Sequence, residues 1–277
     1  MKKFAIVFLT AVACVCLTGC VHLPQTLAEQ SQGYGYTPLD PLPVILTNAV
    51  ADDVTNSQAT LRALPDETMR LAVGEYSGNG TITYGPASMG YAGSNYVVVL
   101  DYIKYNTLSL PLYQYQDFPP NTNRFVYLPT VDPTKLGPDK IIPIYVGVGI
   151  RMTANVKVNS GNVNLGNLIA IGAAADTKVV SGTLVIQTMG ISGQSVSSAI
   201  PIPSDVNGTT IANALMAVGT IKSKFYDNSG DVTIKPQVLG MYNNIGSGFD
   251  DVISPLLAKP PVLDTTLGAG AKLMQAK

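Results

Sequence analysis

The chain is poor in the residues that carry much metal and nucleophilic chemistry. Its 277 residues include three cysteines, one histidine and no tryptophan. All three cysteines lie within the first twenty residues, and the histidine is His22. The sequence beyond His22 therefore has no means of forming a disulfide, a thiolate nucleophile, a histidine general base or a histidine–metal site.

Charged residues are also scarce. They make up 13% of the chain, with a formal net charge of −1, whereas 46% of the residues are hydrophobic. This balance gives no basic footprint for nucleic acid, and the hydrophobic content argues against disorder. Beyond residue 20, no apolar run reaches the roughly 18 residues that indicate a transmembrane helix.

The first twenty residues have the order of a secretory signal. Lysines at residues 2–3 precede a short apolar stretch at 4–15, and the sequence Leu-Thr-Gly-Cys follows at 17–20. This order resembles the lipobox signal of bacterial lipoproteins. The resemblance implies that residues 1–19 are removed and that Cys20 is lipidated. The alternative is an ordinary secretory signal with a chance cysteine.

The residue after the cysteine bears on location. It is Val21, whereas an aspartate there favours retention in the inner membrane of enteric bacteria. The resemblance therefore implies an outer-membrane protein, anchored by lipid and facing either the periplasm or the cell surface. Two or more lipid chains make such attachment stable.

The rest of the chain divides by composition into three parts. Residues 20–43 hold glutamine, glycine and proline without a lasting period, which indicates a flexible tether behind the anchor. Residues 44–254 are expected to form a single domain. Residues 255–277 are rich in proline, glycine and alanine, and are expected to form a loose C-terminal tail.

Alternation of period two indicates β structure through the domain. It is clearest in residues 145–158, where seven apolar residues alternate with glycine or polar residues. The proline-rich segment 111–143 is expected to be an irregular connection with one edge strand at 124–128. The four predicted strands of the sheet are 96–105, 145–158, 179–189 and 231–242.

Helical periodicity is limited to a few segments. Residues 211–225 place apolar side chains on one arc, with Thr209 or Thr210 as the N-cap. A short helix is expected at 165–175 and a further helix at 44–64. The fold class predicted is α+β, a mainly antiparallel β sheet with one or two packed helices; an all-β sandwich is the alternative.

Carboxylates are the remaining candidates for catalysis. Several of them could supply the pair used in glycan hydrolysis: Glu67, Glu75, Asp101, Asp117, Asp176, Asp250 and Asp251. Asp101 is the most unusual, because it interrupts an apolar strand. The favoured interpretation places Asp101 on a solvated face or as the cap of a loop. No catalytic residue, metal site or cofactor is predicted, and the chain is not expected to be an enzyme.

Tyrosines gather in the first half of the chain. Ten of them lie between residues 34 and 115. Exposed tyrosine suits contacts with sugars or proteins, but tyrosine is equally a normal strand residue. The candidate partner-contact residues are Tyr76, Tyr84, Tyr91 and Tyr96.

Together these features predict an outer-membrane lipoprotein, a non-catalytic accessory or structural protein in the assembly or export of a surface structure or envelope complex. In its loose plan of lipid anchor, α+β layout and alternating segments near Gly/Ser turns, the chain resembles curli-secretion pore lipoproteins. A subunit of an oligomeric secretion pore is therefore an alternative. A surface adhesin or glycan-binding protein, and a carboxylate-dependent glycan-acting enzyme, are the others. The expected partners are the membrane, other envelope proteins and, for a pore, further copies of the chain.

Overall fold

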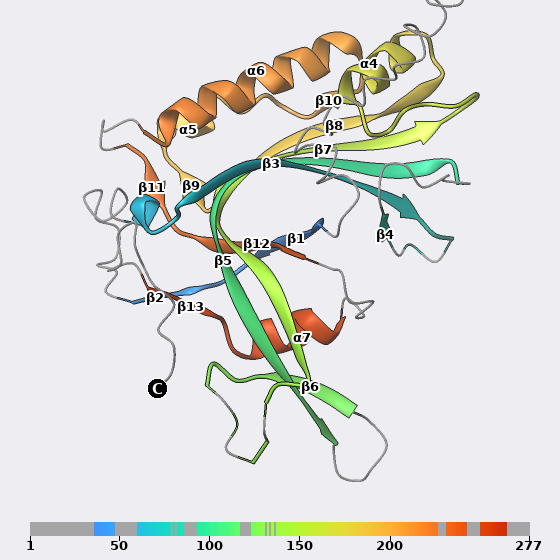
Figure 1. Ribbon diagram of the computed structural model, residues 1–277. Coiled ribbons are helices and arrows are strands. Elements are labelled where there is room, and N and C mark those ends of the chain that lie inside the picture. The colour runs from blue at the N-terminus through green and yellow to red at the C-terminus, as the bar shows by residue number, and fades with distance from the viewer. Residues whose placement is uncertain are drawn as a thin grey trace, which may run out of the picture.

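A computed structural model describes residues 36–47, 60–78, 80, 82–85, 93–116, 123–130, 132, 134–135, 137–226, 231–242 and 250–264. One nine-stranded antiparallel sheet dominates these residues, and helices cover part of one of its faces (Figure 1). The predicted α+β class with a mainly antiparallel sheet is confirmed. Cys20, His22 and Tyr91 lie outside the described residues.

Two long strands form the centre of the sheet. β5 (Asn95–Gln116) pairs with β7 (Lys140–Val158) along almost its whole length. The pair runs from beneath the helices to the far end of the molecule, where β6 (Asn123–Tyr127) joins β5 (Figure 1). The predicted strands at 96–105 and 145–158 thus belong to longer ones, and β6 matches the predicted edge strand.

The prolines expected to keep 111–143 irregular are partly accommodated inside the ladder. Pro111 lies in β5 and Pro143 in β7. Pairing of β5 with β3 ends at Tyr105 and pairing with β6 begins at Leu112. Pairing of β7 with β12 ends at Ile144. Each proline therefore has a partner strand on only one side, and proline is tolerated at such edge positions of a sheet.

The other strands complete a curved sheet. β8 pairs with the second half of β7 and β12 with its first half, and the sheet curls far enough for β1 to contact β3. Two further strand pairs, β11–β9 and β13–β2, lie outside it. The bounds are β1 Tyr36–Leu42, β2 Ile45–Thr47, β3 Asp66–Tyr76, β4 Ile82–Gly85, β8 Val180–Met189, β9 Ile191–Ser192, β10 Ser204–Asp205, β11 Thr233–Ile234, β12 Gln237–Tyr242 and β13 Val262–Asp264.

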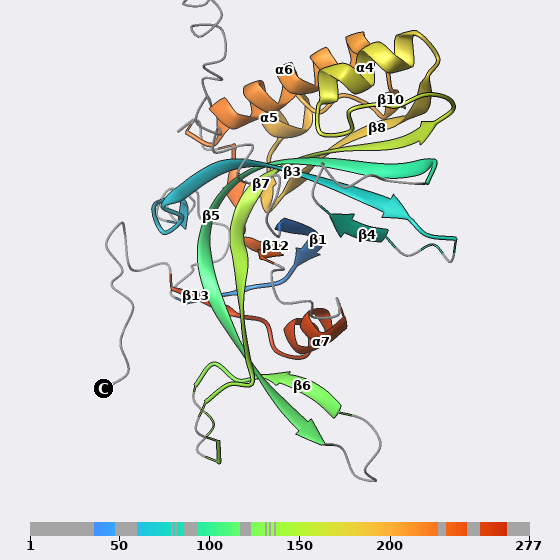
Figure 2. The ribbon, with the colours of Figure 1, turned by 45° about the vertical axis from the view of Figure 1, so that its right-hand side comes forward.

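Three helices lie on one face of the sheet, as both views show (Figures 1 and 2). They are α4 (Leu168–Asp176), the one-turn α5 (Gln194–Ser197) and α6 (Gly208–Lys224), which confirms the helices predicted at 165–175 and 211–225. Within the described ranges, no helix has both the length and the apolar character needed to cross a membrane.

The start of α6 differs from the prediction by two or three residues. Its N-cap is Asn207, whose side chain accepts a bond from the Thr210 N–H, while the Thr210 hydroxyl accepts one from the Asn207 N–H. This reciprocal capping satisfies backbone donors at the exposed helix end.

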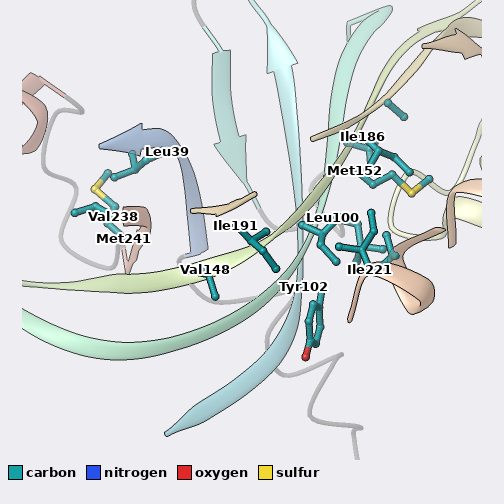
Figure 3. Close-up of a cluster of buried hydrophobic side chains, with 14 of the residues drawn as sticks. Leu39, Leu100, Tyr102, Val148, Met152, Ile186, Ile191, Ile221, Val238 and Met241 are labelled. Carbon is teal, nitrogen blue, oxygen red and sulfur yellow. The ribbon is translucent and has the colours of Figure 1, made fainter. Parts of the chain in front are cut away.

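The main core fills the space between helices and sheet. Even-numbered residues of β5 and β7, such as Leu100 and Met152, pack with Ile186 of β8 and Ile221 of α6 (Figure 3). Burying a side chain of this size stabilises the fold by about 1.5–3 kcal/mol. The alternation visible in the sequence is therefore the alternation between this core and the opposite face.

The boundaries expected for the tether and the tail need correction. Tyr36–Leu42 form β1 and not part of the tether, because Tyr36 and Leu39 are buried against the sheet. Residues 255–264 do not belong to a loose tail: they include the end of α7 (Asp250–Ala258) and β13, held by buried Leu256 and Leu263.

Two predicted elements are also corrected. The predicted helix 44–64 is wrong at 45–47, which form β2, and is helical at 60–62; residues 48–59 lie outside the described ranges. The predicted strand 231–242 is split into β11 and β12 before Pro236, where the Lys235 N–H turns to the Gly190 carbonyl.

Candidate functional site

The face of the sheet turned away from α4 and α6 contains a buried ion pair. Asp101 on β5 and Arg151 on β7 lie directly opposite each other and are 0% and 5% exposed. Arg151 Nε donates to Asp101 Oδ1 at 2.8 Å, and Nη2 donates to Oδ2 at 2.7 Å. This two-bond geometry is the strongest form of the arginine–carboxylate contact.

The remaining polar atoms of the pair are also satisfied. The Tyr36 hydroxyl donates to Asp101 Oδ2. Arg151 Nη1 donates to the Leu39 carbonyl at 2.7 Å, and Nη2 donates to the Leu239 carbonyl at 3.0 Å. A single guanidinium thus joins β1, β5, β7 and β12. Two charges can remain buried here because each is paired and hydrogen-bonded.

Protonation in this network is fixed. Burial, with the nearby charge of Asp101, raises the pKa of Tyr36 well above its usual value. Burial lowers the pKa of Arg151, but its hydrogen bonds and attraction to Asp101 outweigh this and raise it. Tyr36 is therefore a neutral donor and Arg151 a cation near neutral pH. General acid–base catalysis would need pKa values closer to the working pH.

The expected position of Asp101 on a solvated face or at a loop cap is wrong. The carboxylate is buried because its counter-charge lies on the neighbouring strand. Sequence reasoning missed Arg151 and Tyr36 as its partners. The available signal was a pair of opposite charges, each placed within an alternating apolar strand.

Two of the four candidate tyrosines come together beside this network. Tyr76 on β3 and Tyr84 on β4 share its face of the sheet, and the Tyr76 hydroxyl donates to Asn155 Oδ1 at 3.0 Å. Tyr84 is half-buried; burial raises its pKa to about 12, although the charge of Arg151 opposes the rise. Tyr76 is 36% exposed.

Gly74 makes room for this arrangement. A Cβ at this position would lie 2.5 Å from Ile82 Cγ2, 2.8 Å from Val97 Cγ1 and 3.1 Å from Tyr84 Cε1. The absent side chain lets Tyr84 pack across β3 next to the network.

The other two candidates do not join them. Tyr96 is 3% exposed on the helix-covered face, and its hydroxyl donates to the Gly93 carbonyl. Its proposed contact with a partner is therefore corrected: the side chain is part of the core. Tyr91 lies outside the described residues.

The carboxylates considered for glycan hydrolysis are dispersed. Glu75 lies opposite Tyr96 and so shares the helix-covered side, whereas Asp101 faces the other side. Asp176 ends α4, where it accepts a bond from the Gly208 N–H at 3.1 Å. Among the described residues, no group of three or more His, Cys, Asp or Glu side chains is placed to hold a metal ion.

A second polar cluster joins α6 to β3. Lys222 Nζ lies 2.6 Å from Glu67 Oε1, and the Tyr226 hydroxyl donates to Oε2 at 2.6 Å. Partial burial raises the pKa of Glu67, but the hydrogen bonds from Lys222 and Tyr226 outweigh this and lower it to about 2. The cluster fastens the last turn of the helix to the sheet.

Comparisons with family models, curated proteins and solved structures gave no match.

Proposed function

We propose that the chain is an outer-membrane-anchored lipoprotein with a non-catalytic accessory or structural role in assembling or exporting a surface structure or envelope complex. The observation that carries this proposal is the lipobox-like sequence at residues 17–20 behind a positive and an apolar segment.

The buried charges of the domain support a structural role. Among the described residues, the charged side chains with little exposure are Asp101, Arg151 and Asp132. Asp132 accepts bonds from the Thr134 N–H at 2.8 Å and the Thr134 hydroxyl at 2.6 Å, and one from Tyr115. The bonds of Asp101 and Arg151 thus join strands to one another, and those of Asp132 hold its loop together and attach it to β5 through Tyr115.

The position of β1 supports close attachment to the membrane. Fifteen residues separate Cys20 from Tyr36, the first residue of β1. A fully extended chain spans at most about 3.5 Å per residue, so the lipidated cysteine would hold β1 within roughly 55 Å of the bilayer. The domain would then work at the membrane surface.

Lipidation is tested by labelling cells that express the full chain with an alkyne analogue of palmitate. Wild type should take up label and sediment with outer membranes, and Cys20→Ser should lose both properties. Cys16→Ser is the matched control, because it removes another cysteine of the same segment and should keep the label. Unlabelled wild type, or labelled Cys20→Ser, would contradict the anchor.

The accessory role needs its own measurement. Surface fractions of a deletion strain should lack one protein or polymer assembly, which the wild-type gene restores and Cys20→Ser does not. An unchanged surface composition in the deletion strain would contradict this role.

A further inference from the structure

The layer formed by β8, α5, β10 and α6 has almost no charge. Between Lys178 and Lys222, Asp205 is the only charged residue. Over the whole chain the charged fraction is 13%. Protein surfaces that stay in water usually carry charges throughout, whereas the centres of protein–protein interfaces are depleted of them.

Large apolar side chains project from the same layer. Ile202, just before β10, is 85% exposed, and Met216 on α6 is 64% exposed. The exposed residues along α6 follow a helical period and are all uncharged: Thr209, Ala212, Asn213, Met216, Gly219, Thr220 and Ser223. This face of α6 is therefore apolar or weakly polar up to the last turn, which carries Lys222 and Lys224.

A cavity opens beside Ile202. Its volume is about 170 Å³, and Leu184, Ile186 and Ala214 provide much of its apolar wall. Ile202 and Asn213 also line it, which places the cavity between β8, the segment before β10 and α6. A dry cavity of about 150 Å³ accommodates benzene, so this one has room for a branched aliphatic side chain.

We infer that this surface, defined as the exposed face of α6 with residues 201–204 and the adjoining cavity, binds a second copy of the chain about a two-fold axis. Ile202 of each copy enters the cavity of the other. A two-fold contact brings the same patch onto both sides, so a charged patch would repel itself. This nearly uncharged patch meets its copy without repulsion, and its projecting side chain lies next to its own recess.

A bilayer fits the surface less well. Interfacial helices use Lys and Arg at the headgroups and aromatic residues below them. The exposed face of α6 has neither before its last turn. The inference deepens the proposed function by naming a partner, and it rests on that proposal only for the place where the copies meet.

Cysteine cross-linking in membranes of cells that express the full chain tests the contact directly. The chain has no cysteine beyond residue 20, so new ones are unique in the domain. Two differently tagged chains, one with Ile202→Cys and one with Asn213→Cys, should form a mixed disulfide dimer under mild oxidation. Its yield should exceed by at least tenfold that of Ile141→Cys with Asn213→Cys, because Ile141 lies at the start of β7, beside the end of β5 where β6 joins the sheet.

The mass of the detergent-extracted full chain gives a second reading. Wild type should be a dimer, and Ile202→Glu should reduce the dimer fraction at least tenfold. Ile141→Glu, also at an exposed isoleucine, should leave it unchanged. A folded circular dichroism spectrum for both variants shows that the substitutions act on association.

Two outcomes overturn the inference directly: a monomeric wild type, and a mixed disulfide yield no higher than that of the control. A third would assign the face to lipid: a monomer that binds phosphatidylcholine vesicles and loses this binding in Ile202→Glu. The proposed function fails independently of these outcomes. An unlipidated chain that still cross-links through Ile202→Cys and Asn213→Cys would contradict the lipid anchor and support the contact between copies.

Discussion

Asp101 and Arg151 face each other across the β5–β7 pair, and both oxygens of the carboxylate are bonded to the guanidinium. Arg151 also donates to carbonyls on β1 and β12. Its side chain therefore ties these two strands to the central β5–β7 pair.

Asp101→Asn should destabilise the domain strongly. The substitution leaves a buried guanidinium without its counter-charge, which costs about 3–5 kcal/mol. Urea unfolding followed by circular dichroism measures the loss. Asp205→Asn, at an exposed aspartate, is the control and should change stability by less than about 0.5 kcal/mol. Equal effects of the two substitutions would show that the ion pair does not stabilise the fold.

Replacing both members of the pair should cost less than the two single losses suggest. Asp101→Leu with Arg151→Met removes both charges together, so no uncompensated charge stays buried. A double-mutant cycle from the same unfolding curves should give a coupling of at least about 1 kcal/mol. Additive effects would contradict direct coupling of the two residues.

Tyr36→Phe should have an intermediate effect. It removes the hydroxyl that donates to Asp101 but keeps the ring, whose centroid lies 5.7 Å from that of Tyr145. A hydrogen bond to a charged group contributes about 1.5–3 kcal/mol, so the substitution should lower the free energy of unfolding by about this amount. Thermal unfolding curves measure the loss. Tyr76→Phe loses an exposed hydrogen bond to Asn155 and should lower the free energy of unfolding by less than about 0.5 kcal/mol. The reverse ranking would contradict the network.

Stability should decrease in acid through Glu67. Its folded-state pKa of about 2 lies below the ordinary value of 4.5, so the unfolded chain binds the proton more readily between these values. The contribution is present above pH 4.5 and is lost as the pH falls toward 2. Because the side chain is about one-third exposed, solvent screening keeps it below about 1 kcal/mol. Wild type and Glu67→Gln should differ in unfolding free energy at pH 7 and converge near pH 2; a constant difference would exclude titration of Glu67.

Gly74→Ala should disturb β3 and β4. The new Cβ would lie within 3 Å of side chains on Ile82 and Val97, and overpacking of this kind costs about 1–3 kcal/mol. Gly78→Ala is the matched control, since no atom lies within 4 Å of its new Cβ. Equal unfolding curves for the two variants would show that the side chains around Gly74 move aside without a measurable loss of stability.

The elements that the sequence predicted well are those whose period is set by one strong face. β7 and α6 each direct a regular row of apolar residues into the core between the sheet and the helices, so the sequence of each shows a clear period. β1 was missed because Pro38 and Pro41 lie within it and few of its residues alternate. Its place depends on β12, which follows about two hundred residues later, and local pattern holds no information on such pairing.

The network was harder to predict than the fold. Asp101 and Arg151 are 50 residues apart in sequence, and only the register of β5 against β7 places them together. A shift of one residue would send the two side chains to opposite faces. The tyrosines show the same limit: Tyr76 and Tyr96 come from similar sequence surroundings, but one is exposed and the other is in the core.

The hydrogen bonds of Arg151 also imply an order in which the strands fold, if the chain is exported as proposed. Leu39 lies 112 residues before Arg151, and Leu239 lies 88 residues after it. A chain that emerges with its N-terminus first presents β1 early, but β1 has no partner strand until β12 has crossed. The pairing of β1 is thus completed last, and contacts this distant in sequence form slowly. If the chain is exported as proposed, its protection from envelope proteases should rise late in translocation, when the C-terminal strands arrive.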